Sequence, residues 1–442
     1  MSRPRGVNVI GYLQAELGLG EAARKLVAAT ERADIPTATV TYTRVPHRQE
    51  HRFEGRGTGR APFDTNIICV NADQLPLLHR DLGPDVLAGR YAIGVWFWEI
   101  AEFPANLHSS FDLVDEVWVA SEFVHEAVSK ETNKPVRIVP MPLEPPAVAT
   151  PDRHELGLPD GFLFLFIFDY YSVNARKNPL GLVEAFKRAF GEGAGPMLLV
   201  KSINGKQRGD ALARLLEATA DRSDIEVRDG FVAPEEKDAL VAACDCYVSL
   251  HRSEGLGLTM AEAMSLAKPV IATGYSGNLA FMNERNSFLV RYSLTRIPAG
   301  CDPYPVGVEW AEPDLDHAAE LMRRVYERQD EARAVGERAH SDLVASHSLD
   351  RAAAFVRERV AAIPDDRRQL LELKEPLERA AVRLRELPGE SLAASGPPGV
   401  RTLRRALRKL LWPELQAQRE LDEKLVRSLE ALAGELERTP RP

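Results

Sequence analysis

The sequence predicts two doubly wound α/β domains, each built on a parallel sheet, that face each other across a cleft and are followed by a helical C-terminal extension. Two observations predict this fold. Short apolar runs of strand length alternate with helical segments, which is typical of parallel sheets covered on both faces. A proline-rich stretch at 140–151 interrupts this alternation once, as a linker between domains would. We therefore expect domains over 1–145 and 146–363 and an extension over 364–442.

The first half of the chain begins with a strand at Val7–Tyr12, followed by a glycine-containing loop and a helix at Glu21–Arg32. Further strands are expected at apolar runs of similar length, namely Ala38–Tyr42, Thr65–Val70, Tyr91–Trp96 and Glu116–Ala120. Helical or turn-rich segments separate these runs, and this favours parallel pairing through crossover connections.

The same alternation starts again after the linker. Strands are expected at Phe162–Phe168, Pro196–Val200, Ile225–Arg228, Cys246–Leu250 and Pro269–Thr273. Helices are expected at Pro179–Phe190, Ala211–Ala220, Pro234–Ala243 and Leu258–Ser265, and over most of 317–363. Ligands of such sheets bind beyond the carboxyl ends of the strands, so we expect the binding site in the cleft between the domains.

Composition and charge narrow the class of protein. The formal net charge of −9 argues against general nucleic-acid binding, which needs a basic face. No stretch approaches eighteen uninterrupted apolar residues, and the amino terminus lacks the apolar region of a signal peptide. The four cysteines do not suggest a disulfide framework in a chain of this length. We therefore expect a soluble protein of the cytoplasm.

The segment Glu254–Glu262, between an expected strand and an expected helix, carries the chemistry. Gly255 and Gly257 allow the backbone to turn sharply and to approach a ligand closely. The free amides at the start of the following helix attract phosphate oxygens. Both glutamates can face one pocket, where a carboxylate accepts hydrogen bonds from vicinal hydroxyls such as those of a sugar. The pattern indicates a site for a sugar phosphate.

This segment resembles the retaining glycosyltransferases of family four, which have the GT-B fold of two Rossmann-like domains. The resemblance rests on two glutamates separated by seven residues and on the short motifs around them, and it covers roughly residues 160 to 330. The matching motifs are Arg176-Lys-Asn-Pro179, Asp229-Gly-Phe-Val232, Glu262-Ala-Met, Lys268-Pro-Val-Ile-Ala-Thr, Ser276-Gly-Asn278 and Asn286-Ser-Phe-Leu-Val290.

The resemblance implies roles for individual residues of the donor site. Glu254 would contact hydroxyls of the transferred sugar, and Glu262 the ribose hydroxyls of the nucleotide. Lys177 and Arg176 would neutralise the diphosphate, although both charges could instead be solvated on the surface. Further residues expected at the donor site are Gly255, Leu256, Gly257, Leu258, Thr259, Phe231 and Val232, together with Gly18 and Gly20 of the first glycine loop.

Trp98 and Glu99 follow an expected strand of the first domain, close to where related enzymes often carry a histidine, and are our candidates for the acceptor side. Asp314-Leu315-Asp316 is the Asp-x-Asp of the chain, a pattern that binds a metal in the other large glycosyltransferase fold. Because a helical segment follows at once, we expect a helix N-cap there instead. We predict no metal and no cofactor besides the nucleoside-diphosphate sugar.

By this resemblance the chain would be a retaining, metal-independent glycosyltransferase. It would move a hexose from GDP-mannose or a UDP-hexose to a hydroxyl of a glycan or glycolipid acceptor, such as a growing bacterial surface polysaccharide. Two alternatives remain open. One is a non-catalytic scaffold that binds a nucleotide sugar in a polysaccharide assembly complex, and the other is a sugar-nucleotide epimerase on the same GT-B architecture.

The C-terminal extension contains a second type of pattern. Leu403, Leu407, Leu410 and Leu411 form one helical stripe, with arginines and a lysine around it. Such a basic amphipathic helix could rest on an anionic membrane at its inner face. The leucine spacing that follows favours helix association, so 401–438 could instead mediate self-association or docking to a partner enzyme.

Overall fold

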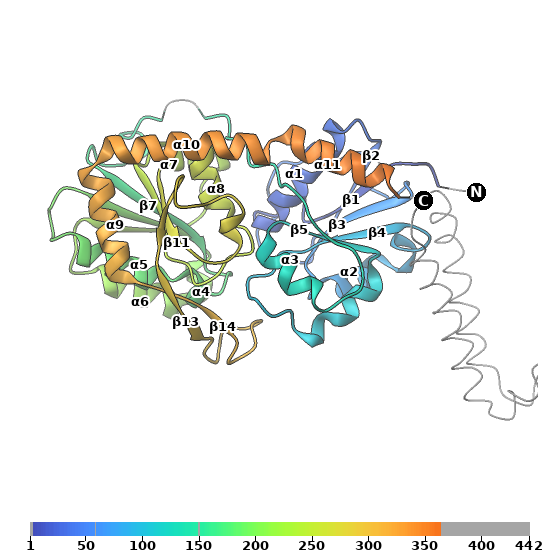
Figure 1. Ribbon diagram of the computed structural model, residues 1–442, viewed down its shortest axis with the longest axis horizontal. Helices are drawn as coiled ribbons and strands as arrows, with labels where there is room; N and C mark the ends of the chain where they lie inside the picture. Colours follow the sequence, from blue (N-terminus) through green and yellow to red (C-terminus); the bar gives the residue numbers. More distant parts are fainter. Residues whose placement is uncertain (1–2, 58, 149–150, 364–442) are drawn as a thin grey trace, which may run out of the picture.

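The structure is a computed structural model, and it describes residues 3–57, 59–148 and 151–363. Within these residues the chain forms two α/β domains, each built on a parallel sheet of six strands with helices packed around it (Figure 1). The predicted fold class is confirmed for this part of the chain. The expected extension over 364–442, including the candidate association segment 401–438, lies outside the described residues.

The sheet of the first domain has the strand order β2-β1-β3-β4-β5-β6. All of its described pairings are parallel, and every residue of β1, β3, β4 and β5 is buried, as expected for strands covered on both faces. The strands are β1 Val7–Gly11, β2 Thr37–Thr41, β3 Thr65–Cys69, β4 Tyr91–Val95, β5 Glu116–Val119 and β6 Val136–Ile138. The helices are α1 Gly18–Arg32, α2 Leu75–Leu82 and α3 Glu122–Ser129.

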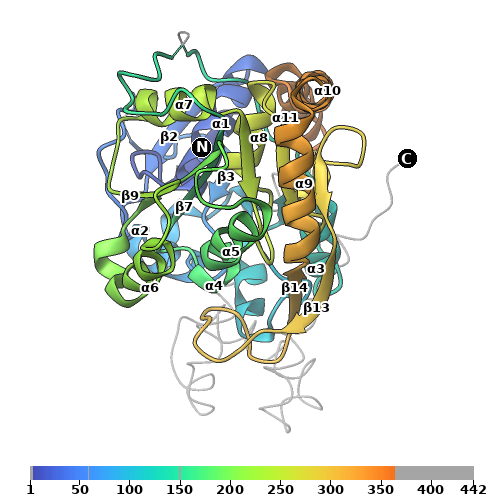
Figure 2. The same cartoon turned by 90° about the vertical axis from the view of Figure 1, so that its left-hand side faces the viewer.

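The sheet of the second domain has the order β12-β11-β10-β7-β8-β9, again with parallel pairing. Its strands are β7 Leu163–Asp169, β8 Met197–Ile203, β9 Ile225–Asp229, β10 Cys246–Ser249, β11 Val270–Thr273 and β12 Phe288–Val290. The helices between them are α4 Asn174–Lys177, α5 Pro179–Ala189, α6 Gly209–Thr219, α7 Pro234–Ala243 and α8 Leu258–Ser265. On one face of this sheet α5 packs against α9, Leu315–Glu327 (Figure 2).

Three local features differ from the sequence-based expectation. Helix α1 begins at Gly18 rather than at Glu21. The sequence did not predict this first turn, because glycine has a low helix propensity. Strands β6 and β12 are three residues each, too short to give a periodic signal. A hairpin of β13 Tyr292–Arg296 and β14 Glu309–Pro313 was not expected, since the loop that joins its strands separates them in sequence.

The last described helices connect the domains. α9 is followed by α10 Gln329–His347 and α11 Leu349–Ala361, which confirms the helical character expected for 317–363. α10 extends along the top of the molecule, and α11 packs against α1 of the first domain (Figure 1). Arg359 of α11 lies 2.7 Å from the buried carboxylate of Glu116 on β5. The chain therefore returns to the first domain at its described end.

Asp314 caps α9, since its side chain accepts a hydrogen bond of 3.0 Å from the backbone amide of His317. The N-cap interpretation of the Asp-x-Asp pattern is confirmed. Among the described residues, no group of three His, Cys, Asp or Glu side chains is placed to hold a metal ion. None of the described helices has both the length and the apolar character needed to cross a bilayer.

Candidate functional site

The candidate site lies where loops from both sheets meet. In the second domain, the loops after β7 and β10 carry the cations and the first glutamate of the motif. From the first domain, the segment after β4 reaches them, because Ser253 donates a hydrogen bond from Oγ to the backbone carbonyl of Glu99. Ser121, at the start of α3, likewise donates to the carbonyl of Gly255 over 2.9 Å. Both domains therefore build this site.

A short helical turn, α4, positions the two cations. It is followed by Asn178, whose left-handed backbone (φ 56°) separates α4 from α5. The Asn178 side chain caps α5 by accepting a hydrogen bond from the amide of Gly181. The same side chain donates to the carbonyl of Leu250 over 2.9 Å. This one asparagine therefore fixes the turn that carries Arg176 and Lys177 to the loop after β10.

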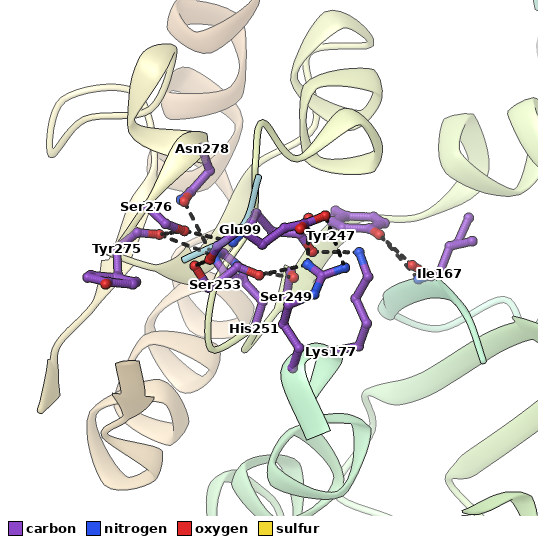
Figure 3. Close-up of polar contacts among 12 residues, drawn as sticks. Glu99, Ile167, Lys177, Tyr247, Ser249, His251, Ser253, Tyr275, Ser276 and Asn278 are labelled. Carbon is purple, nitrogen blue, oxygen red and sulfur yellow. Dashed lines mark hydrogen bonds and ion pairs between the residues drawn. The ribbon is translucent and has the colours of Figure 1, made fainter. Parts of the chain in front are cut away.

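Four charged side chains meet at this point, and two of them, Glu99 and Lys177, are labelled in Figure 3. Lys177 donates from Nζ to Oε1 of Glu254 over 2.5 Å, and Arg176 Nη1 lies 3.1 Å from the other oxygen of that carboxylate. Arg176 Nη2 lies 3.9 Å from Oε1 of Glu99. Arg176 is 5% exposed and Lys177 18%, which excludes the alternative that both are solvated surface charges. Three of these residues were predicted as donor-site residues and one as an acceptor-side residue.

The two carboxyl groups differ in their electrostatic surroundings. Burial alone would raise the pKa of Glu254, but the charges of Arg176 and Lys177 outweigh it and lower that pKa to about 2. Burial also raises the pKa of Glu99, and there the more distant Arg176 only partly offsets it. The pKa values of these two neighbouring acids are thus shifted in opposite directions, an arrangement that recurs in active sites.

The loop that carries Glu254 depends on two glycine positions. Gly257 has a left-handed backbone (φ 93°) at the N-cap of α8, which favours glycine. A Cβ on Gly277 would lie 2.1 Å from the carbonyl oxygen of Gly255. The backbone of the Ser276-Gly-Asn278 motif therefore packs directly on the glutamate loop.

Glu262, the second glutamate of the motif, lies on α8 and does not share the cation pair of Glu254. Its Oε2 lies 2.9 Å from Nζ of Lys237, which comes from α7. Burial alone would lower the pKa of Lys237, but the carboxylates of Glu262 and Asp238 outweigh it and raise that pKa. The sequence analysis missed Lys237, because nothing in its own segment distinguishes it from an exposed helical lysine.

A buried histidine, also missed from the sequence, supports the glutamate loop. His251 contacts Ser249 Oγ at 3.1 Å through Nδ1, and Asn278 Oδ1 at 3.2 Å through Nε2 (Figure 3). Burial lowers the pKa of His251, so the ring is neutral and one of its nitrogens accepts a hydrogen bond. This network links the end of β10 to the Ser276-Gly-Asn278 motif.

The remaining donor-site candidates of the second domain lie on α8, in the loop before it and in the loop after β9. Leu256 is buried, and its side chain belongs to the apolar core. Leu258 and Thr259 form the first turn of α8. Phe231 and Val232 follow β9, and the exposed ring of Phe231 has Arg48 of the first domain 5.3 Å from its centre.

The two candidate glycines of the first domain, Gly18 and Gly20, have different surroundings. A Cβ on Gly18 would contact Leu258, 3.6 Å away, so the start of α1 faces the start of α8. A Cβ on Gly20 would clash with the carbonyl oxygen of Ala15 at 2.5 Å, so packing within the first domain explains this glycine. Trp98 is buried and donates from Nε1 to the carbonyl of Glu102 over 2.8 Å, which leaves its backbone to face the site.

Residues 164–295 match the family model described as glycosyl transferases group 1. No curated protein matches the chain in sequence. The match includes α4, α8 and the loop before α8, and with them the charged candidates Arg176, Lys177, Glu254 and Glu262.

Solved structures of similar fold cover most of the chain. Anabaena HepE in complex with UDP and glucose has a TM-score of 0.60 and 12% identity, covering 81% of this chain and 100% of that one. A glycosyltransferase from Rickettsia africae has a TM-score of 0.57 and 14% identity, covering 81% and 100%. Sucrose-phosphate synthase from Thermosynechococcus elongatus has a TM-score of 0.57 and 16% identity, covering 81% and 99%. At these identities the likeness shows the fold, and with the family match it supports a glycosyltransferase of GT-B architecture.

Proposed function

We propose that this chain is a retaining glycosyltransferase that moves a hexose from a nucleoside-diphosphate sugar to a hydroxyl of a glycan or glycolipid acceptor. The donor would be a UDP-hexose or GDP-mannose. No metal ion would take part, and the reaction would occur in the cytoplasm, or at the inner face of the membrane where a lipid-linked acceptor is found.

One observation carries this proposal: a buried carboxylate, Glu254, lies between two cations at the start of α8 and beside a carboxyl of the other domain. Departure of a diphosphate develops negative charge, which fixed cations and helix-terminal amides stabilise better than water does. A fixed carboxylate can accept hydrogen bonds from the hydroxyls of the transferred sugar. HepE, of similar fold, was solved with UDP-glucose, so a UDP-hexose is the first donor to test.

In the proposed reaction, the bond between the anomeric carbon and the diphosphate oxygen breaks, and its electron pair stays on the diphosphate. The acceptor oxygen forms the new bond to the anomeric carbon on the face that the diphosphate leaves. The acceptor proton passes to an oxygen of the departing phosphate. Lys177 and Arg176 stabilise the diphosphate charge, Glu254 orients the sugar, and Glu262 binds the ribose.

The two alternatives differ from this proposal in what the chain does with its donor. A scaffold would bind a nucleotide sugar without turnover, and an epimerase would release a changed sugar without any acceptor. The residues that the resemblance assigns to donor binding and transfer, Glu254, Glu262 and Lys177, are all present, and this favours transfer over a scaffold. The absence of an epimerase motif from the sequence favours transfer over epimerisation.

A donor and acceptor panel tests the proposal. The full chain is incubated with UDP-glucose, UDP-galactose or GDP-mannose, each with octyl glucoside or octyl mannoside as a surrogate acceptor. We expect acceptor-dependent release of one nucleoside diphosphate that persists in EDTA, and an NMR signal showing that the anomeric configuration is retained. Inversion of configuration contradicts the retaining mechanism. Tight donor binding with no release under any pairing supports the scaffold.

A further inference from the structure

The loop of the β13–β14 hairpin connects the second domain to the core of the first. Tyr304, in that loop, is buried in the same apolar cluster as residues of β1 and β4, together with Ile297 and Trp310 of the hairpin. Its ring contacts Trp98 at a centroid distance of 5.7 Å and an interplanar angle of 67°. The second domain therefore contributes a fixed aromatic side chain to the acceptor side of the site.

The phenol of Tyr304 reaches the charged centre. It donates a hydrogen bond from its hydroxyl to Oε2 of Glu99 over 3.0 Å, while Arg176 lies 3.9 Å from Oε1. At that distance Arg176 forms an ion pair but no hydrogen bond, so Oε1 keeps its capacity to accept one. The orientation of Glu99, a residue of the first domain, is thus set by two residues of the second.

Exposure distinguishes Glu99 from its partners. Its side chain is 21% exposed, against 5% for Arg176 and 10% for Glu254, so it is the one of these three with the most surface for a ligand. Tyr304 holds one oxygen of this carboxyl in place and leaves the other available. A preorientated carboxyl can align a bound hydroxyl compound at little entropic cost.

We propose that Glu99 binds the acceptor through hydroxyls next to the attacking one, and that Tyr304 is the positioning residue that fixes the Glu99 carboxyl for this purpose. The acceptor is accordingly a sugar or another polyol with neighbouring hydroxyls. The inference rests on the proposed function, and it leaves the bond-making step described above unchanged. Burial, which raises the pKa of Glu99, favours a carboxyl that exchanges hydrogen bonds with neutral hydroxyls.

The test is a double-mutant cycle of Tyr304→Phe and Glu99→Gln. Phenylalanine keeps the ring contacts with Trp98 and removes the hydroxyl, and glutamine keeps the shape of the glutamate side chain. Tyr326→Phe is the matched control, because that tyrosine lies on α9 and its hydroxyl donates over 3.5 Å to the carbonyl of Ala194. Each variant is assayed for UDP binding by calorimetry and for transfer from UDP-glucose to octyl glucoside.

We expect Tyr304→Phe to lower kcat/KM for octyl glucoside about tenfold, the size of one hydrogen bond to a charged group, with UDP affinity unchanged within about twofold. The double variant should lose no more than Glu99→Gln alone, because Tyr304 acts through Glu99. Thermal melting checks that each variant is folded.

If the parent protein is active, any one of three results overturns the inference. They are unchanged transfer by Tyr304→Phe, effects of the two substitutions that multiply, and a loss of UDP affinity that parallels the loss of transfer. If the parent transfers from none of the donors tested, the proposed function itself fails, and this inference fails with it. The two failures are therefore distinguishable.

Discussion

Lys177 and Glu254 are 77 positions apart, yet Nζ of the lysine lies 2.5 Å from Oε1 of the glutamate. The pair joins α4 to the loop after β10, and Arg176 holds the second oxygen of the same carboxylate. The resemblance assigns Lys177 to the diphosphate and Glu254 to the sugar. Their direct contact means that a sugar diphosphate bound here would meet both groups at once.

Lys177→Met should weaken UDP binding by about tenfold or more, because a diphosphate loses one of two fixed cations. It should also destabilise the fold, since Glu254 keeps only Arg176 as a cationic partner. Calorimetry with UDP and urea unfolding measure the two effects. Lys187→Met is the control: Lys187 forms a comparable 2.5 Å pair with the exposed Asp221, far from the site in α5. Equal effects of the two substitutions would argue against a diphosphate role.

Glu254→Gln should change the pH dependence of stability. A carboxyl whose pKa is lower in the folded chain stabilises the fold above its unfolded pKa and loses that stabilisation as the pH falls through its folded pKa. For Glu254 the pKa falls from 4.5 to about 2 on folding. The parent should therefore have a larger free energy of unfolding than the variant at neutral pH, and this difference should decrease as the pH falls from about 5 to about 2. The gap should shrink by on the order of 3 kcal/mol.

Urea unfolding of parent and Glu254→Gln at a series of pH values measures this gap. Glu184→Gln is the control, because Glu184 pairs with Arg188 on an exposed face of α5. A gap of constant size from neutral pH to about pH 3 would show that Glu254 is not held as a carboxylate by its two cations.

Glu262→Ala should weaken UDP binding by about tenfold, because under the proposed function this carboxylate accepts hydrogen bonds from the ribose hydroxyls. Lys237→Met should weaken it less, since the lysine orients Glu262 from 2.9 Å and has no assigned contact with the nucleotide. The melting-point shift on adding UDP provides the measurement. Glu320→Ala, on the exposed face of α9, is the control. Unaltered UDP shifts in Glu262→Ala would remove Glu262 from the donor site.

Gly277→Ala should disrupt the glutamate loop, because its Cβ would lie 2.1 Å from the carbonyl oxygen of Gly255 and backbone cannot give way as a side chain can. We expect a loss of about 1–3 kcal/mol in the free energy of unfolding and weaker UDP binding. Gly191→Ala is the control, since a Cβ there meets nothing within 4 Å. A Gly277→Ala variant with parental stability and UDP affinity would contradict this packing.

Much of the fold follows from local patterns. The alternation of apolar runs with helices predicted both parallel sheets, and most strand boundaries agree with the structure within a residue or two. The glycines and glutamates of 254–262 identified the central loop, because sharp turns and helix starts depend on adjacent residues. The short strands β6 and β12 and the β13–β14 hairpin were missed, since three-residue strands and a long connection have no clear periodicity.

The sequence by itself determined the two α/β domains, the position of the glycine–glutamate loop and the residues of the donor site to be tested. Only the tertiary structure decided which of those residues touch: Lys177 meets Glu254, Lys237 meets Glu262, and Tyr304 meets Glu99 from 205 positions away. The physical reason is that periodicity and turn chemistry act over a few residues. Contacts between distant segments depend instead on strand order, register and the packing of one domain on the other, which local patterns do not encode.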